Sequence, residues 1–68
     1  MKNYRIYINY TQHNKDGAYF TEKEFTIEEI AKSEYSAYKL GLERLFTEDL
    51  ERGNLARDIN INITKINN

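Results

Sequence analysis

The sequence contains no cysteine, no proline and no tryptophan, and it has a single histidine. Without cysteine the chain has no disulfide framework, and His13 alone cannot form a zinc site of His and Cys ligands. No apolar run approaches the roughly 18 residues that a membrane-spanning helix needs. Residues 1–5 lack the apolar stretch of a secretory signal. We therefore expect a cytoplasmic protein without a membrane segment.

The chain of 68 residues predicts one small domain, residues 1–68. A chain of this size buries only about 60% of the surface that it exposes when unfolded, so its core is small. A disulfide or a structural metal would normally compensate, and neither is expected here. A partner protein or a second copy of the chain could complete the core instead. A homodimer is therefore one expectation from size alone.

The first third of the chain predicts a β-hairpin. Residues 3–11 alternate apolar or aromatic side chains with polar ones, which is typical of a strand with one buried face. Gly17 supplies the positive-φ position of a hairpin turn within residues 12–17. Pairing Tyr10 with Tyr19 places Arg5 opposite Glu24 as a favourable charge pair. The second strand is weakly apolar in this register and suits the edge of a sheet.

Residues 26–52 predict one long amphipathic helix. Thr26 begins a capping box, and Gly53 provides a C-terminal stop. Ser33 is an alternative N-cap, in which case the second strand would continue toward Ala31. One face carries apolar residues at steps of three and four: Ile27, Ile30, Ala31, Tyr35, Tyr38, Leu42, Leu45 and Phe46.

Gly41 lies in the middle of this helix, where glycine costs about 1 kcal/mol relative to alanine. Its position beside Tyr38 and Leu42 suggests that the helix backbone approaches the sheet closely. A glycine on the helix surface is the alternative.

Residues 58–66 predict a third strand, with Ile59, Ile61 and Ile63 on one face. Residues 54–58 are predicted to form a loop in which Leu55 folds back as a plug, and the strand is predicted to fray or bend before Ile66. A right-handed crossover through the helix places the third strand on the far side of the first. The predicted fold is a two-layer α+β domain of β-β-α-β order. It has a three-stranded antiparallel sheet in the order 2-1-3 and one long amphipathic helix on one face. The order 1-2-3 would put the charged second strand in the centre and is disfavoured.

No pattern in the sequence predicts catalysis. His13 is expected in a turn, whereas Ser33 and Ser36 are expected on the helix, so nothing places a base beside a serine nucleophile. Neighbouring carboxylates such as Glu28 and Glu29 point in different directions on a helix. Residues 14–17 lack the further carboxylates of a calcium loop. We therefore expect no enzymatic activity, no metal site and no cofactor.

Charge is distributed unevenly along the chain. Residues 22–51 hold nine acidic residues against four basic ones, a balance of −5, while the flanks, residues 1–21 and 52–68, each carry +2. The acidic stretch is either a solvated helix face or a surface for a basic partner. The helix residues that we predict as contacts are Glu43, Glu48 and Glu51.

The outer face of the sheet is the second predicted binding surface. Arg5, Tyr7 and Phe20 give it the mixture of aromatic and arginine side chains that is common at protein interfaces. The alternative is that this face binds single-stranded nucleic acid through aromatic stacking. Glu22 and Glu24 on the same face, and the absence of a basic stripe, argue against nucleic acid.

In length, composition and lack of catalytic residues, the chain resembles the small accessory proteins of bacteriophages and mobile elements. Many of these, anti-CRISPR proteins included, inhibit by occupying a host protein surface. The resemblance covers no motif, so it assigns no residues. It implies a non-enzymatic protein-binding module, whose partner could be a host complex that itself binds nucleic acid.

Overall fold

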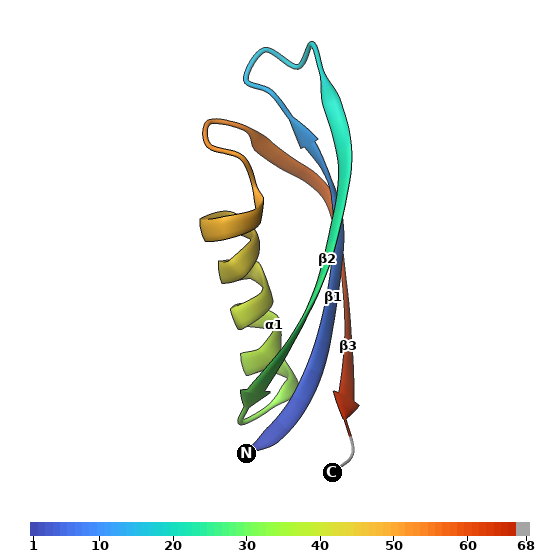
Figure 1. Ribbon diagram of the computed structural model, residues 1–68, viewed down its shortest axis with the longest axis vertical. Coiled ribbons are helices and arrows are strands. Elements are labelled where there is room, and N and C mark those ends of the chain that lie inside the picture. The colour runs from blue at the N-terminus through green and yellow to red at the C-terminus, as the bar shows by residue number, and fades with distance from the viewer. Residues whose placement is uncertain (67–68) are drawn as a thin grey trace.

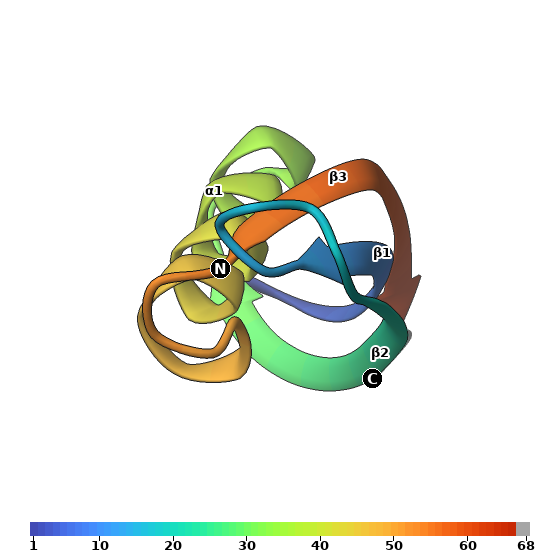
Figure 2. The same ribbon diagram turned by 90° about the horizontal axis from the view of Figure 1, so that it is seen from above.

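The computed structural model describes residues 1–66 and shows a three-stranded antiparallel sheet with one helix on one face (Figure 1). The elements are β1 (Lys2–His13), β2 (Phe20–Ala31), α1 (Glu34–Arg44), the π-helical turn η1 (Leu45–Asp49) and β3 (Leu55–Ile66). The sheet order is β2-β1-β3, which confirms the predicted α+β fold. Figure 2, a view along the long axis, shows β1 between β2 and β3 with α1 to one side. The long strands make the molecule narrow, with extents of 44 × 16 × 14 Å.

The pairing of β1 with β2 is shifted by four residues from the predicted register. Tyr10 lies opposite Lys23, and Arg5 lies opposite Glu28 rather than Glu24. The turn occupies residues 14–19, so β1 extends to His13, and β2 is longer than predicted because it continues to Ala31. Tyr19 lies exposed within the turn. The observed register places Phe25 and Ile27 on the inner face beside the isoleucines of β1, which buries more apolar surface. An even shift keeps each side chain on its predicted face, because the side-chain period of a strand is two.

The helix begins at Ser33, so the preferred start at Thr26 is wrong and the alternative is correct. The Ser33 Oγ accepts a hydrogen bond from the Ser36 backbone N–H at 3.1 Å. Residues 26–31 instead extend β2 along β1 as far as Lys2. The helical spacing of apolar residues in this segment also fits a strand, because Ile27 and Ala31 alternate with exposed residues.

Two small residues form the face of α1 that packs on the sheet, and Leu45 of η1 continues it. Ala37, Gly41 and Leu45 follow one another at steps of four and are buried against β1. A Cβ atom at Gly41 would lie 2.8 Å from the Ile6 Cγ2 and 2.9 Å from the Ile8 Cδ1. This contact shows the predicted close approach of the helix backbone to the sheet.

Several large apolar residues of the predicted stripe lie outside the core, although Leu45 is fully buried. Tyr35 and Phe46 remain 69% and 54% exposed, so their predicted burial is wrong. They lie on the side of the helix that points along the sheet rather than onto it. Bulky side chains between α1 and β1 would hold the helix away from the sheet, and the small residues occupy that contact instead.

Strand β3 changes phase at Asp58, whose φ is +53°. The pairing of β1 with β3 shifts there, between Asn9 and Thr11. Because of this bulge, Ala56 before it and Ile59 after it both pack against the core. Leu55 begins the strand and is exposed, so the predicted loop and plug are wrong. The strand continues to Ile66, beyond the predicted fraying point.

A group of polar side chains closes the core at the end of the helix. The Tyr10 hydroxyl donates to the Asp49 carboxylate at 2.6 Å, and the Lys23 ammonium donates to the Asp49 backbone carbonyl at 2.7 Å. The buried Gln12 side chain accepts a hydrogen bond from the Glu51 backbone N–H at 2.8 Å. These contacts attach the end of η1 to β1 and β2. Every buried side-chain polar atom of residues 1–66 has a hydrogen-bond partner.

Tyr10 makes the free energy of unfolding depend on pH in the alkaline range. Burial, together with the hydrogen bond to Asp49, raises the pKa of Tyr10 above its ordinary value of 10.0. Above pH 10 the folded state therefore binds more protons than the unfolded chain, and stability falls as pH rises. The stabilisation is fully present below pH 10, and the loss has a limiting slope of about 1.4 kcal/mol per pH unit. Urea unfolding of the wild type and of Tyr10→Phe, from pH 8 to pH 11, measures the difference.

The exposed Tyr19→Phe variant is the control for loss of a phenol without burial. Its free energy of unfolding should change with pH as that of the wild type does. The free energy of unfolding of Tyr10→Phe should fall less steeply as pH rises. If the free energy of unfolding fell equally steeply with pH in the wild type and in Tyr10→Phe, the loss of stability would not come from Tyr10.

Candidate interaction surface

The face of the sheet opposite α1 is covered by no other element of residues 1–66, and we call it the open face (Figures 1 and 2). In the middle of β1 it presents Arg5, Tyr7 and Asn9, which alternate with the buried residues of that strand. The neighbouring strands add mostly polar residues at the same levels. The open face is therefore a broad polar surface.

Arg5 is held by a carboxylate on β2. Its Nη2 and Nε atoms lie 3.1 and 3.2 Å from the Glu28 Oε2. Both side chains are more than half exposed, so the ion pair contributes little to stability. Its effect is to fix the orientation of the guanidinium group on the surface.

Tyr7 is fixed in a similar way. Its hydroxyl donates a hydrogen bond to the Glu24 Oε1 at 2.5 Å, across the diagonal between β1 and β2. This hydrogen bond to a carboxylate raises the pKa of Tyr7 above its ordinary value. The Tyr7 side chain is half-buried. Arg5 and Tyr7 thus lie side by side in a preorganised arrangement.

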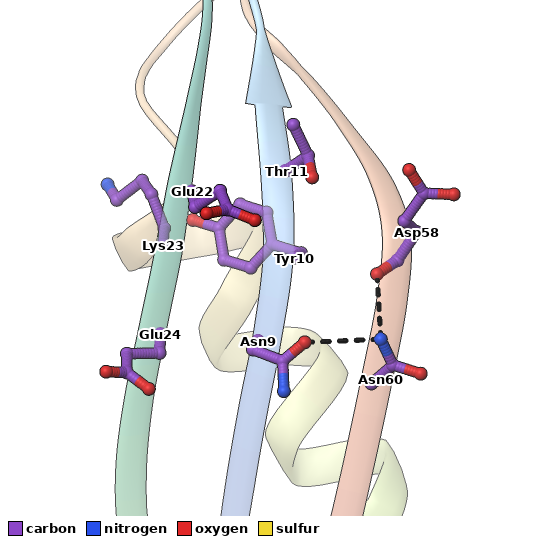
Figure 3. A pocket seen from close by; sticks show the side chains of 8 residues that line it. All are labelled: Asn9, Tyr10, Thr11, Glu22, Lys23, Glu24, Asp58 and Asn60. Carbon is purple, nitrogen blue, oxygen red and sulfur yellow. Dashed lines mark hydrogen bonds between the residues drawn. The ribbon is translucent and has the colours of Figure 1, made fainter.

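Beyond Tyr7 the open face has a shallow hollow of about 440 Å³ (Figure 3). The Asn60 side-chain amide spans its floor and donates to the Asn9 side chain and to the Asp58 carbonyl, both at 3.2 Å. Glu22, Glu24 and Asp58 line the hollow with carboxylates. Lys23 also contributes to the lining, but its ammonium group is bound to Asp49. The hollow is therefore acidic and suits a cationic group better than a phosphate.

Phe20 does not join Tyr7 in one aromatic patch. It lies opposite His13 at the far end of the hairpin, with the two ring centroids 5.8 Å apart, whereas Tyr7 lies opposite Thr26. Six residues of strand separate the two levels, or about 20 Å. The predicted register brought them together, and the four-residue shift separates them. Phe20 is 69% exposed at the tip of the molecule.

The three predicted helix glutamates also do not form one surface. All are exposed, but Glu48 pairs with Arg44 at 3.2 Å in a groove beside β2, while Glu51 follows η1 in the loop. Glu43 and Glu48 are five residues apart, which places them roughly 140° apart around a helix. Arg44 also pairs with Glu29 at 3.3 Å, so part of the acidic charge is neutralised within the chain.

The residues considered for catalysis are far apart. Ser33 lies just past the end of β2 that pairs with Lys2, whereas His13 lies at the opposite end of β1. The length of the strand between them is about 37 Å. Within residues 1–66, no three His, Asp or Glu side chains are grouped closely enough to hold a metal ion.

A second surface was missed by the sequence interpretation. Tyr35 and Tyr38 lie next to Ile61 and Ile63 of β3, and Phe46 is exposed farther along the helix in η1. We call these five residues the aromatic edge. The Tyr35 and Tyr38 rings stack with centroids 6.5 Å apart, and the Lys39 ammonium lies 5.5 Å from the Tyr35 ring centroid. The spacing of Ala37 and Gly41 is the signal that could have found it, because residues four apart lie on the same side of a helix and two small ones there allow close packing.

Comparisons of the chain with protein-family models, with curated proteins and with solved structures found no match. No helix within residues 1–66 is long and apolar enough to cross a membrane.

Proposed function

We propose that the protein is a non-enzymatic binding module that occupies the surface of another protein with its open face. The observation that carries this proposal is the fixed pair of Arg5 and Tyr7, each held by a carboxylate of β2. Arginine and tyrosine are among the residues that contribute most to protein interfaces. Side chains that are already ordered lose less conformational freedom when a partner binds.

The partner that fits this face has a basic surface. The hollow beside Tyr7 is lined by Glu22, Glu24 and Asp58. Charge complementarity accelerates association and favours such a partner over an acidic one. Inhibition of a host protein in the cytoplasm, by a protein of a phage or mobile element, is the setting that we propose.

Single-stranded nucleic acid has less support as the ligand. The open face lacks a row of Lys and Arg for phosphates, because Arg5 is bound to Glu28 and Lys23 is bound to Asp49 on the other side of the sheet. Tyr7 and Phe20 are too far apart to stack neighbouring bases.

Site-specific photo-crosslinking tests the proposal. A benzoylphenylalanine at Thr26, which is exposed and opposite Tyr7 on β2, should crosslink to one protein in a host lysate. The same probe at Glu43, on the outside of the helix, should not. With the purified partner, Arg5→Ala and Tyr7→Ala should each weaken binding about tenfold or more, as expected for central interface residues.

Two results would contradict this function. One is equal crosslinking from Glu43 and from the open face. The other is a crosslink that disappears after nuclease treatment, together with affinity that falls steeply with salt, which would indicate nucleic acid.

A further inference from the structure

The two edges of the sheet differ strongly in charge. Strand β2 carries five charged residues among its twelve, namely Glu22, Lys23, Glu24, Glu28 and Glu29. In β3 the six residues 59–64 (Ile-Asn-Ile-Asn-Ile-Thr) carry no charge. Charged side chains and prolines normally protect an edge strand from pairing with another chain. The β2 edge has this protection, whereas the centre of β3 lacks it.

The unprotected edge adjoins the aromatic edge. Glu34, Tyr35 and Tyr38 line a groove of about 440 Å³ together with Ile61 and Ile63. Phe46 lies eleven residues after Tyr35, close to three helical turns, so it continues the same side of the helix. An exposed strand and an exposed apolar groove are thus continuous along one side of the molecule.

We infer that this side binds a second copy of the same chain, by antiparallel pairing of β3 with β3 of the partner subunit. A twofold axis at Ile61 places Ile59 opposite Ile63 of the partner subunit on the inner face. On the outer face it places Asn60 opposite Asn62 of the partner subunit. The edge is therefore self-complementary, as a twofold interface requires. Pairing would join the two sheets into one of six strands.

The helices fit this arrangement. Because Gly41 contacts Ile6 and Ile8, α1 lies over β1, and the two copies of β1 would be three strand spacings apart, or about 14 Å. This distance exceeds the 8–10 Å of directly packed helices. Long side chains are needed to fill the gap, and the aromatic edge supplies them. The helices would run antiparallel, so that Tyr35 faces the level of Phe46 of the partner subunit.

A stable dimer would have to bury both the aromatic edge and the strand edge of β3. Tyr35, Tyr38 and Phe46 are 69%, 40% and 54% exposed. At about 200 Å² for a fully buried aromatic side chain, they would bury roughly 300 Å² per copy. A stable interface needs about 800 Å² per partner. The strand edge and its isoleucines must supply the remainder, which is why the aromatic residues alone do not define the surface.

Sedimentation equilibrium and native mass spectrometry of the full chain test this inference. The wild type should have twice the monomer mass of 8.1 kDa at micromolar concentration. Tyr35→Ala/Phe46→Ala should raise the dimer dissociation constant at least tenfold. Asn60→Lys/Asn62→Lys should do the same by placing like charges opposite each other, whereas Asn60→Asp/Asn62→Lys should restore the dimer.

Ile30→Ala is the control, because Ile30 is an exposed apolar residue outside this surface. It should leave the dissociation constant unchanged, and circular dichroism should show that every variant is folded. A wild type that is monomeric at millimolar concentration would overturn the inference. So would a dimer that neither the aromatic nor the lysine variant weakens. The Tyr35→Ala/Phe46→Ala variant changes no residue of the open face, so this test and the test of the proposed function can fail separately.

Discussion

Truncation of Ile8 to alanine is expected to lower the free energy of unfolding by about 2–5 kcal/mol. Ile8 is fully buried in the central strand, where it is flanked by Phe25 and Ile61 and covered by Gly41 of the helix. These three neighbours belong to β2, β3 and α1, which are regular elements, so they cannot easily move to fill the cavity that the truncation leaves. A chain of 68 residues has a total stability of roughly 3–10 kcal/mol, so this variant would be close to unfolding.

Urea unfolding followed by circular dichroism measures this loss. Ile30→Ala is the matched control, because it is the same truncation at a side chain that is 60% exposed. It should change stability by no more than about 0.5 kcal/mol. Similar losses in both variants would show that Ile8 is not at the centre of the core.

Replacement of Gly41 by valine is expected to destabilise the protein by about 2–3 kcal/mol, near the upper end for an overpacked core. The new Cβ would already lie within 3 Å of both Ile6 and Ile8, and valine adds two methyl groups there. Valine has a better helix propensity than glycine, so a glycine on an exposed surface would give the opposite sign. Thermal unfolding distinguishes them, because the melting temperature should fall if Gly41 is packed against the sheet and rise if it is exposed.

Glu43→Val controls for a β-branched residue in the same helix, because Glu43 is exposed. Its effect should stay within about 0.5 kcal/mol. A Gly41→Val variant as stable as the wild type would mean that the backbone at Gly41 does not lie against Ile6 and Ile8.

The fold was predictable because its main features depend on local patterns. The alternation in residues 3–11 indicates a strand whatever its partner is, and the right-handed crossover gives the sheet order. The register was not predictable in the same way. Pairings of Tyr10 with Tyr19 and with Lys23 both keep the apolar residues on one face, because they differ by an even number of residues. Tertiary packing of Phe25 and Ile27 decides between them.

The surfaces were less predictable than the fold. Arg5 and Tyr7 lie on the open face, as predicted, but the shift in register gives them Glu28 and Glu24 as partners and moves Phe20 away. The helical spacing predicts Tyr35 and Phe46 in the core, because apolar residues at this spacing usually are buried. Here the need for close contact at Gly41 selects the small residues instead, and the sequence pattern contains two apolar stripes of which only one is packed.

The central position of β1 has a consequence for the order of folding. Only residues 14–19 separate β1 from β2, and hairpins of this kind form in about 1–10 μs. The other neighbour of β1 is far along the chain, since Asn9 and Asn60 are 51 residues apart. Closing so long a loop is slow, so β3 is expected to dock after the hairpin has formed. Until it does, the middle strand keeps one row of backbone amides and carbonyls in water.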